Sequence, residues 1–292
     1  MRNRGKIRTE IRRMLNDEKL PYKWNDAILD DRINLWHKKV VKTTDILIAI
    51  ESYSTIQYQS KYALPSDFLS ISKKWQVSFD GKKIEPLDIE REDVASPTWR
   101  TRVASTPTDY YIDETHQYLV LTPPPASAAD TDTVQDVGGI SDTDTTITLS
   151  STSDFDQKGA IIIDDEVIHY GYKSSTQLLL CERGMEGTTA ASHANGATIT
   201  KRDILLYYNY EPSDLNNDSD VPFNGINAYE SYHLSIVHAV VSMCLGTIPE
   251  KIELSMSQYG FYEREEKKME FEAAHPKHNP QRFKVDPRYL IR

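Results

Sequence analysis

The sequence contains little cysteine and no long apolar segment. Cys181 and Cys244 are the only cysteines among 292 residues, too few and too far apart for a disulfide scaffold or for the paired spacing of a zinc site. No apolar run approaches the roughly 20 residues that a membrane span needs, and no hydrophobic segment follows the basic residues 1–6. We therefore expect a protein that is neither secreted nor embedded in a membrane. A content of 39% hydrophobic and 27% charged residues excludes a collagen-like or wholly disordered chain, and the length suits two domains.

Sequence motifs of catalytic and nucleotide-binding sites are also missing. There is no Walker lysine, dinucleotide fingerprint or nucleophile elbow. The run Asp164, Asp165 and Glu166 precedes His169, which resembles a metal or acid–base cluster. Along a strand, however, Asp164 and Glu166 lie on one face while Asp165 and His169 lie on the other. We interpret them as a turn leading into a strand, and we predict no catalytic residues, no cofactor and no metal.

Two other groups of candidate ligands have the wrong spacing. Asp214, Asp218 and Asp220 lie in an Asn-rich loop, but the loop lacks the glycine and the terminal glutamate of a calcium-binding EF-hand. Acidic residues ahead of a helix explain them more simply. His233 and His238 are five residues apart, about 140° around a helix, so they do not form the i, i+4 zinc pair. We expect His233, on an apolar face, to make a partly buried polar contact.

The net charge of −10 is distributed unevenly along the chain. Residues 1–43 carry a net charge of +6 and residues 274–292 carry +4, whereas residues 44–273 carry −20. Basic ends on an acidic body could bind polyanions, and they could equally dock on an acidic partner or on a neighbouring copy of the chain. The body itself should repel DNA, because carboxylates there outnumber lysine and arginine by about two to one.

Apolar residues recur at helical spacing near both ends of the sequence. We predict a helix over residues 5–19 and a second that begins after the N-cap Asn25, together a helical hairpin. Residues 227–245 form a third predicted helix with Gly246 as its stop. A fourth follows Pro249, weakened in its middle by Gly260. The apolar face of the second helix consists of Leu29, Ile33, Trp36 and Val40.

Between the helices the pattern is that of short antiparallel strands. From about residue 50 to residue 122 the period is two, with a turn at Asp80-Gly81. Residues 126–152 are rich in Asp, Thr, Ser and Ala, a composition that indicates a linker. The pattern then predicts about five short strands within residues 145–200. Without residues 126–202, strand residues 119–121 and 205–208 would be joined by a short turn. We therefore expect a small β module inserted into a hairpin, since loop tips tolerate such insertions.

These patterns predict an α+β fold: a helical body with an antiparallel β subdomain and an inserted small all-β domain. The expected boundaries are 1–125 plus 203–274 for the host domain, 126–202 for the insert and 275–292 for an extended C-terminal tail. The tail combines three prolines with five basic and five apolar residues, so we expect it to dock on a partner. Its candidate contact residues are Lys277, Arg282, Phe283, Lys284, Arg288 and Tyr289.

Several sequence segments, taken in their order, resemble segments of head-to-tail adaptor (head-completion or connector) proteins of tailed bacteriophages. The first is Tyr62–Phe68, at the start of a predicted strand, and the second is Tyr118–Pro124, at the end of one. The third is Tyr208–Pro212, followed by Asp218–Pro222 and a predicted helix. The resemblance covers roughly residues 6–125 and 203–273. The insert, through residues 161–170, 181–184, 187–191 and 193–197, resembles a small β module that recurs in phage virion proteins.

The resemblance implies a structural protein of the virion neck, made in the host cytoplasm. Its relatives form a ring, usually of twelve identical subunits, that binds beneath the portal protein and meets a tail or nozzle protein below. Double-stranded DNA passes through the lumen without specific binding, and no membrane is involved. We expect the insert to project into solvent and the tail to dock on the portal or on the neighbouring subunit.

Two other functional classes remain as alternatives. The first is a minor tail or host-surface protein that uses the β module to bind a surface glycan. The second is an enzyme that acts on DNA or cell wall, which would need a carboxylate pair or metal constellation that the sequence does not display.

Overall fold

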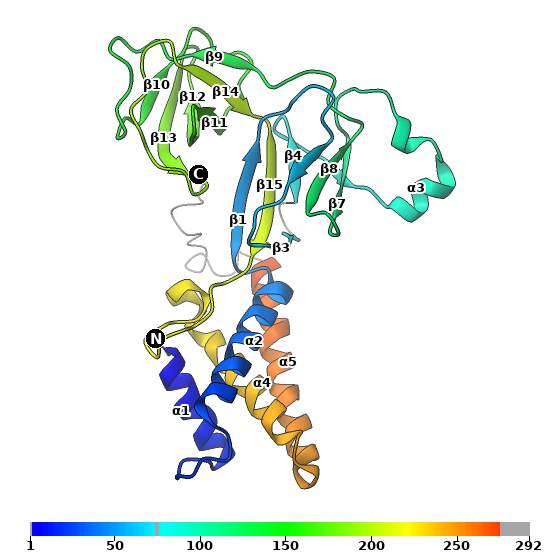
Figure 1. The fold of residues 1–292 in the computed structure, drawn as a ribbon, viewed down its shortest axis with the longest axis vertical. Coiled ribbons are helices and arrows are strands. Elements are labelled where there is room, and N and C mark those ends of the chain that lie inside the picture. Colours follow the sequence, from blue (N-terminus) through cyan, green and yellow to red (C-terminus); the bar gives the residue numbers. More distant parts are fainter. Residues whose placement is uncertain (1, 74–75, 275–292) are drawn as a thin grey trace. The chain divides into compact units, whose positions relative to one another are not determined.

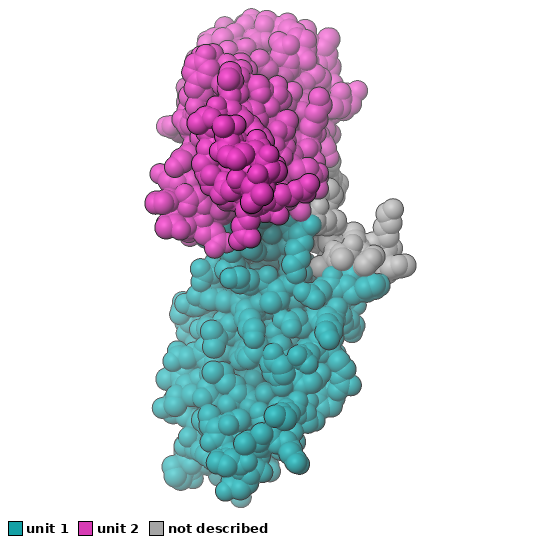
Figure 2. All heavy atoms as spheres, turned by 90° about the vertical axis from the view of Figure 1, so that its right-hand side faces the viewer, with its two compact units in different colours: residues 1–48, 67–74, 209–284 teal, residues 49–66, 75–208, 285–292 magenta. Residues whose placement is uncertain are grey.

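The computed structural model describes residues 2–73 and 76–274, and it is an α+β protein (Figure 1). The described residues divide into two compact units (Figure 2). The helical unit comprises residues 2–48, 67–73 and 209–274, and the β unit comprises residues 49–66 and 76–208. The helices are α1 (Arg4–Leu15), α2 (Asp26–Thr44), α3 (Ile89–Ala95), α4 (His233–Leu245) and α5 (Ile252–Ala274), with short 3-10 turns at Trp99–Thr101, Phe223–Gly225, Asn227–Tyr232 and Pro249–Lys251.

Helices α1 and α2 form the predicted hairpin. The side chain of Asn25 accepts a hydrogen bond from the backbone N–H of Ile28 at 2.8 Å, which confirms it as the N-cap of α2. Asn3 caps α1 in the same way. Helix α1 is shorter than expected because Asn16 adopts a left-handed conformation (φ 55°) that ends it.

Helices α4 and α5 complete the core of the helical unit. Helix α4 is apolar on nearly all sides and is almost entirely buried, as expected for a helix surrounded by others. Trp36 of α2 packs edge-on against Tyr262 of α5, with ring centroids 4.8 Å apart. Gly260 does not interrupt α5, which is continuous over 23 residues. His233 is fully buried rather than partly buried.

The described strands form three sheets. One sheet has the order β1-β15-β4-β5, with β3 also pairing with β15; the second has the order β2-β8-β7-β6; and the third has the order β10-β13-β12-β11-β14-β9. The strands are β1 (Ile48–Tyr53), β2 (Lys61–Ala63), β3 (Phe68–Ile71), β4 (Val77–Phe79), β5 (Lys82–Lys83), β6 (Glu85–Pro86), β7 (Asp109–Asp113), β8 (Tyr118–Thr122), β9 (Thr131–Thr133), β10 (Thr146–Thr148), β11 (Gly159–Ile163), β12 (Glu166–Lys173), β13 (Gln177–Met185), β14 (Thr198–Arg202) and β15 (Ile204–Tyr210).

The prediction that the insert interrupts a hairpin is wrong. β8 lies between β2 and β7 in one sheet, whereas β15 lies between β1 and β4 in another. Each is a central strand with both edges already paired, so neither has an edge available for the other. The three prolines at 123–125 lack an N–H and end β8.

The six-stranded sheet consists only of residues 131–202 and has an apolar core of its own. Its first strand, β9, lies in the stretch that composition assigned to a linker. β9 is an edge strand rich in threonine, so it pairs with β14 without contributing the apolar alternation that sequence analysis looks for. The backbone N–H of Lys201 donates to the carbonyl of Asp130 at 2.8 Å, so the two ends of the insert lie side by side.

Helix α3 was not predicted because none of its residues is buried. It is held by its N-cap, Asp88, which accepts a hydrogen bond from the backbone N–H of Arg91, and by the contacts of neighbouring Trp99. The indole N–H of Trp99 donates to Asp93 at 2.7 Å, and its ring packs edge-on against Tyr111. A helix without an apolar face leaves no periodic signal in the sequence.

We expect the free energy of unfolding to fall when the pH is lowered from 7.5 to 5.0, because of His37 and His233. Both side chains are buried, and burial lowers the pKa of each to about 4. Since the unfolded pKa is near 6.5, the unfolded chain binds more protons between about pH 6.5 and pH 4. Stability is therefore complete above this range and is lost below it, by about 2 kcal/mol for each histidine at pH 5.

Urea unfolding at the two pH values measures this loss. His233→Gln has no ring to protonate and should remove about half of it. His116→Gln, at a side chain that is 67% exposed, should leave the loss unchanged. If His233→Gln shows the same pH dependence as the parent chain, buried histidine is not its cause.

Candidate functional site

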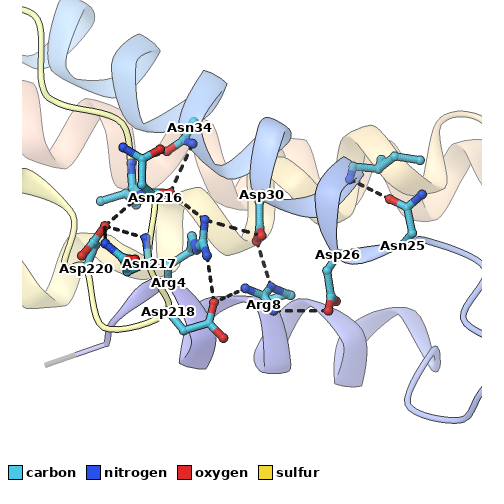
Figure 3. Close-up of polar contacts among 12 residues, drawn as sticks. Arg4, Arg8, Asn25, Asp26, Asp30, Asn34, Asn216, Asn217, Asp218 and Asp220 are labelled. Carbon is cyan, nitrogen blue, oxygen red and sulfur yellow. Dashed lines mark hydrogen bonds and ion pairs between the residues drawn. The ribbon is translucent and has the colours of Figure 1, made fainter.

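Two arginines of α1 hold the loop formed by residues 212–222 (Figure 3). Arg4 and Arg8 are four residues apart and share a face of the helix. Arg4 donates to a carboxylate oxygen of Asp218 at 2.9 Å, and Arg8 donates to the same oxygen. Arg4 also donates to the backbone carbonyl of Leu215 at 2.7 Å. One helix face therefore fixes the middle of the loop.

Helix α2 contributes a second carboxylate to the same arginines. Arg8 Nε donates to Asp30 at 2.8 Å, and Arg4 lies 3.6 Å from Asp30. We call Arg4, Arg8, Asp30 and Asp218 the arginine clamp. Only 13–17% of the Arg4, Arg8 and Asp30 side chains is exposed, so water screens these pairs less than it screens surface ion pairs.

The loop aspartates considered as calcium ligands all have partners from the chain itself. The hydrogen bonds from Arg4 and Arg8 hold the pKa of Asp218 below its usual range. Asp220 accepts hydrogen bonds from two backbone N–H groups of the loop, which lower its pKa, and Asp214 lies 3.1 Å from Lys38. Within residues 2–73 and 76–274, no group of three or more His, Cys, Asp or Glu side chains could hold a metal ion.

The clamp changes the interpretation of the basic N-terminal segment. The charge distribution did not identify the acidic partner of this segment. The structure shows that carboxylates of the same chain are among its partners. Arg12 follows the pattern, with Asp17 at 3.1 Å and Asp26 as a second partner. Arginines that bind carboxylates in this way are not available for phosphate contacts.

In the β unit, two residues of the acidic run 164–166, Asp164 and Glu166, lie on the same face, as the strand pattern predicts. Asp164 lies in the turn before β12 and, like the buried Glu166, contacts His193 at 2.8 Å. Arg183 makes two hydrogen bonds of 2.8 Å to Glu166. Burial would raise the pKa of Glu166, but the hydrogen bonds from Arg183, His193 and two backbone N–H groups lower it to about 2. The carboxylate is therefore ionised at neutral pH, and donors from the chain itself hold it.

A second buried carboxylate, Glu186, joins the insert to the edge of the neighbouring sheet. Glu186 accepts hydrogen bonds from both the backbone N–H (2.9 Å) and the hydroxyl (2.8 Å) of Ser52 in β1. His169 Nε2 lies 2.6 Å from its other oxygen, and Arg202 lies 3.4 Å away. Burial alone would raise the pKa of Glu186, but its interactions with His169, Arg202 and Ser52 together outweigh burial and leave the pKa below its usual value.

Three consecutive charged residues extend this junction, and we call Lys201, Arg202 and Asp203 the polar seam. Lys201, 3% exposed, pairs with Asp80, which follows β4, and lies 3.5 Å from Asp156, which precedes β11. Arg202 donates to the hydroxyl of Ser52 at 2.9 Å, and the carboxylate of Asp203 accepts from the N–H of Thr55 at 2.8 Å. The seam therefore fixes the six-stranded sheet to the sheet that contains β1 and β15.

Sequence reasoning missed the residues that satisfy these carboxylates. Arg183 and His193 lie within the phrases that resemble the phage β module, but their roles depend on contacts across 17 to 29 residues. The predicted contact residues of the tail lie outside the described residues: Lys277, Arg282, Phe283, Lys284, Arg288 and Tyr289. No described helix combines the length and apolar character needed to cross a membrane.

The family model of the SU10 adaptor protein matches residues 2–274. The chain belongs to this family and is a phage adaptor protein, a structural component of the virion. No curated protein matches the chain.

Replacing Asp30 by Asn should lower the free energy of unfolding by about 1–3 kcal/mol, because two arginines lose a charged acceptor in a partly buried site. Urea denaturation measures the difference. Glu18→Gln is a matched control, since its carboxylate lies 4.0 Å from Arg13 and both side chains are more than half exposed. The control should change stability by less than about 0.5 kcal/mol. Equal effects of the two substitutions would contradict a stabilising clamp.

Proposed function

We propose that this adaptor assembles into a ring, of twelve subunits as its phage resemblance implies, beneath the portal. The ring continues the DNA channel from the head toward a tail or nozzle protein. The observation that carries the proposal is the exposure of apolar side chains on more than one side of α5. Ile252, Leu254 and Met256 are 46%, 48% and 69% exposed. Exposed apolar side chains that gather on a helix mark surfaces that other proteins cover.

The pattern along α5 supports a partner on each flank of the helix. Tyr262 and Met269 are buried and seven residues apart, which defines the face that packs on the helical unit. Leu254 and Phe261, also seven apart, share one flank of that face, whereas Met256 lies on the other. In a closed ring each subunit meets one neighbour on each side, so two apolar flanks suit a ring subunit.

The charge of the chain is compatible with a DNA channel. The segment 44–273 carries a net charge of −20, and the N-terminal arginines bind internal carboxylates. A lumen lined by an acidic surface repels phosphate and lets double-stranded DNA slide without specific binding. This accords with a conduit rather than a DNA-binding site.

We further propose that residues 126–202 are an inserted domain and that residues 275–292 dock on the portal. Support for the first is the separate sheet with its own core and adjacent ends. Support for the second is compositional, since the tail combines basic, aromatic and proline residues. The alternative binding partner of the tail is the neighbouring subunit.

Deleting residues 277–292 should abolish binding to a purified portal ring, because the deletion removes the basic and aromatic contact residues together. Electron microscopy of the adaptor, alone and mixed with the portal, measures this. The expected image for the full chain is a ring with a central hole on the portal. The double substitution Lys82→Glu and Lys83→Glu is the control, since it reverses two exposed charges and leaves the tail intact. Unchanged portal binding by the truncated chain would overturn the tail assignment, and a full chain that never binds would favour a peripheral tail or host-surface role.

Deleting residues 128–201 should leave ring assembly intact, because the insert is expected to face solvent. The deletion removes the partners of Ser52 and Asp80, so the variant should melt at a lower temperature while still forming rings on the portal. Failure to form rings, in a variant that retains its circular dichroism, would place the insert in the subunit contacts. Glycan binding by the full-length protein, lost on this deletion, would support the host-surface alternative.

A further inference from the structure

Helix α5 exposes apolar side chains on two sides that have different neighbours within the helical unit (Figure 1). Leu254 and Phe261 lie on one side, and Met256 lies roughly 150° around the helix from them. The ring of Phe261 stacks on His238 of α4, with centroids 5.3 Å apart. This side of α5 therefore borders α4, and the side that carries Met256 borders α2.

Helices α2 and α5 run side by side in the same direction. The ring of Trp36 lies 6.5 Å from the ring of Tyr259. Seven residues further along both helices, the hydroxyl of Thr43 donates to Glu266 at 2.7 Å. Residues of the two helices whose numbers differ by 223 therefore lie at about the same height.

The outer surface of this helix pair is apolar toward the start of both helices. Ile28 and Leu35, seven residues apart on α2, are 38% and 53% exposed. Leu35 lies about 100° before the side of α2 that faces α5, and Met256 lies about 60° beyond the side of α5 that faces α2. Opposite rotations on two parallel neighbours lead to the same side of the pair, so Leu35 and Met256 share one surface.

The same surface is charged further along the helices. Lys42 is exposed and lies seven residues after Leu35, so it continues the line of exposed residues on α2. Glu263 and Glu270 continue the line of Met256 on α5, and Glu270 lies 3.2 Å from Lys73. The surface thus has a cation on the α2 edge and carboxylates on the α5 edge. We call Ile28, Leu35, Lys42, Met256, Glu263 and Glu270 the α2–α5 face.

The opposite flank of α5 projects an aromatic ring that is already held in place. Besides stacking on His238, the Phe261 ring has the guanidinium of Arg264 at 4.5 Å from its centroid. Phe261 is nonetheless 41% exposed. A side chain that is fixed beforehand loses little conformational freedom when a partner covers it. We call Leu254, Phe261, Glu265 and Lys268 the projecting flank.

Charges make the projecting flank complementary to the α2–α5 face. Glu265 lies on the edge of the flank nearer the buried side of α5, and Lys268 lies on the edge nearer solvent. Glu265 and Lys42 differ by 223 in number, so they lie at the same height. In a neighbour turned by the small rotation of a ring and kept at that height, Glu265 comes opposite Lys42, and Lys268 comes opposite the carboxylates that begin with Glu263. Opposite charges in these positions favour this register.

We infer that the projecting flank of one copy of the chain packs on the α2–α5 face of the next copy. Phe261 then lies between Leu35 and Met256 of that copy, and the two charge pairs lie beyond it. The contact joins two different surfaces that point in different directions, so it continues from subunit to subunit. The inference rests on the proposed ring and names the surface that each flank of α5 meets.

Cross-linking of the full-length protein, alone and on the purified portal ring, tests this contact. Lys42→Cys and Glu265→Cys are made separately, mixed and treated with a short bifunctional maleimide. The native Cys181 and Cys244 are buried and should not react. The mixture should give covalent dimers, and a chain with both substitutions should give a ladder of higher multimers. Either single variant alone should stay monomeric, because the contact is heterologous.

The outcomes separate this contact from the proposed function. Covalent dimers from a single variant alone would overturn the inference, and so would a mixture that stays monomeric both in solution and on the portal. Rings on the portal without the cross-link between residues 42 and 265 would overturn the contact and leave the ring standing. Cross-linked dimers in a protein that never binds the portal would support the contact and overturn the proposed function.

Substitutions in the apolar part test its contribution. Leu35→Asp and Phe261→Asp should each weaken self-association at least about tenfold, because each places a charge in an apolar contact. Sedimentation measures the association, and thermal melting reports that each variant folds. Val103→Asp, at a side chain that is 86% exposed outside both surfaces, is the matched control and should leave association unchanged. An equal loss in the control would contradict the contact.

Charge reversal tests the register. Lys42→Glu should weaken association, because it faces Glu265 of the next copy, and Glu265→Lys in the same chain should restore it by reversing the pair. Restoration would not follow if either residue acted only on the fold of its own subunit. A double variant that associates no better than Lys42→Glu alone would overturn the pairing.

Discussion

The arrangement of the β unit depends on three consecutive charged residues that are buried or nearly buried and therefore need partners. Lys201 and Arg202 end β14 and Asp203 precedes β15, and the three side chains contact Asp80, Ser52 and Thr55, which lie in or next to strands β4 and β1. Removing a charge from water costs several kcal/mol unless a partner compensates it. The same contacts that satisfy the seam therefore also determine where the insert lies against that sheet. A module on a flexible linker would carry no such constraint.

The helical unit uses charge in a comparable way. Its N-terminal segment has an excess of arginine and lysine, and the loop and helix beside it supply carboxylates in matching positions (Figure 3). Arg4 and Arg8 serve two elements at once, because a guanidinium offers several donors in a fixed plane. The uneven charge of the sequence is thus partly an internal balance between segments more than 200 residues apart. Net charge by segment could suggest a partner for the arginines, but it could not show that the partner is the same chain.

Helices α1, α2, α4 and α5 and most strands were predictable because their signals are local. The cap at Asn25, the apolar stripe of α2 and the turn at Asp80-Gly81 each lie within a few residues. Strand pairing was harder, since β8 and β15 carry the same apolar pattern whether they pair with each other or with different neighbours. The candidate sites were the least predictable part. Glu186 and Ser52 are 134 residues apart, and no spacing rule connects them.

Several ion pairs among the described residues are nearly buried, while apolar side chains of α5 are exposed, and both features have consequences for assembly. Ion pairs that are nearly buried respond weakly to salt, and so do contacts made through apolar side chains such as Leu254 and Met256. Contacts with polyanions, by contrast, weaken steeply as ionic strength rises. In the ring proposed above, where DNA would move past the protein, holding partners through the first kind of contact and avoiding the second is an advantage. Arg4 and Arg8 are held by Asp30 and Asp218, and the apolar flanks of α5 are the stronger basis for the proposed association.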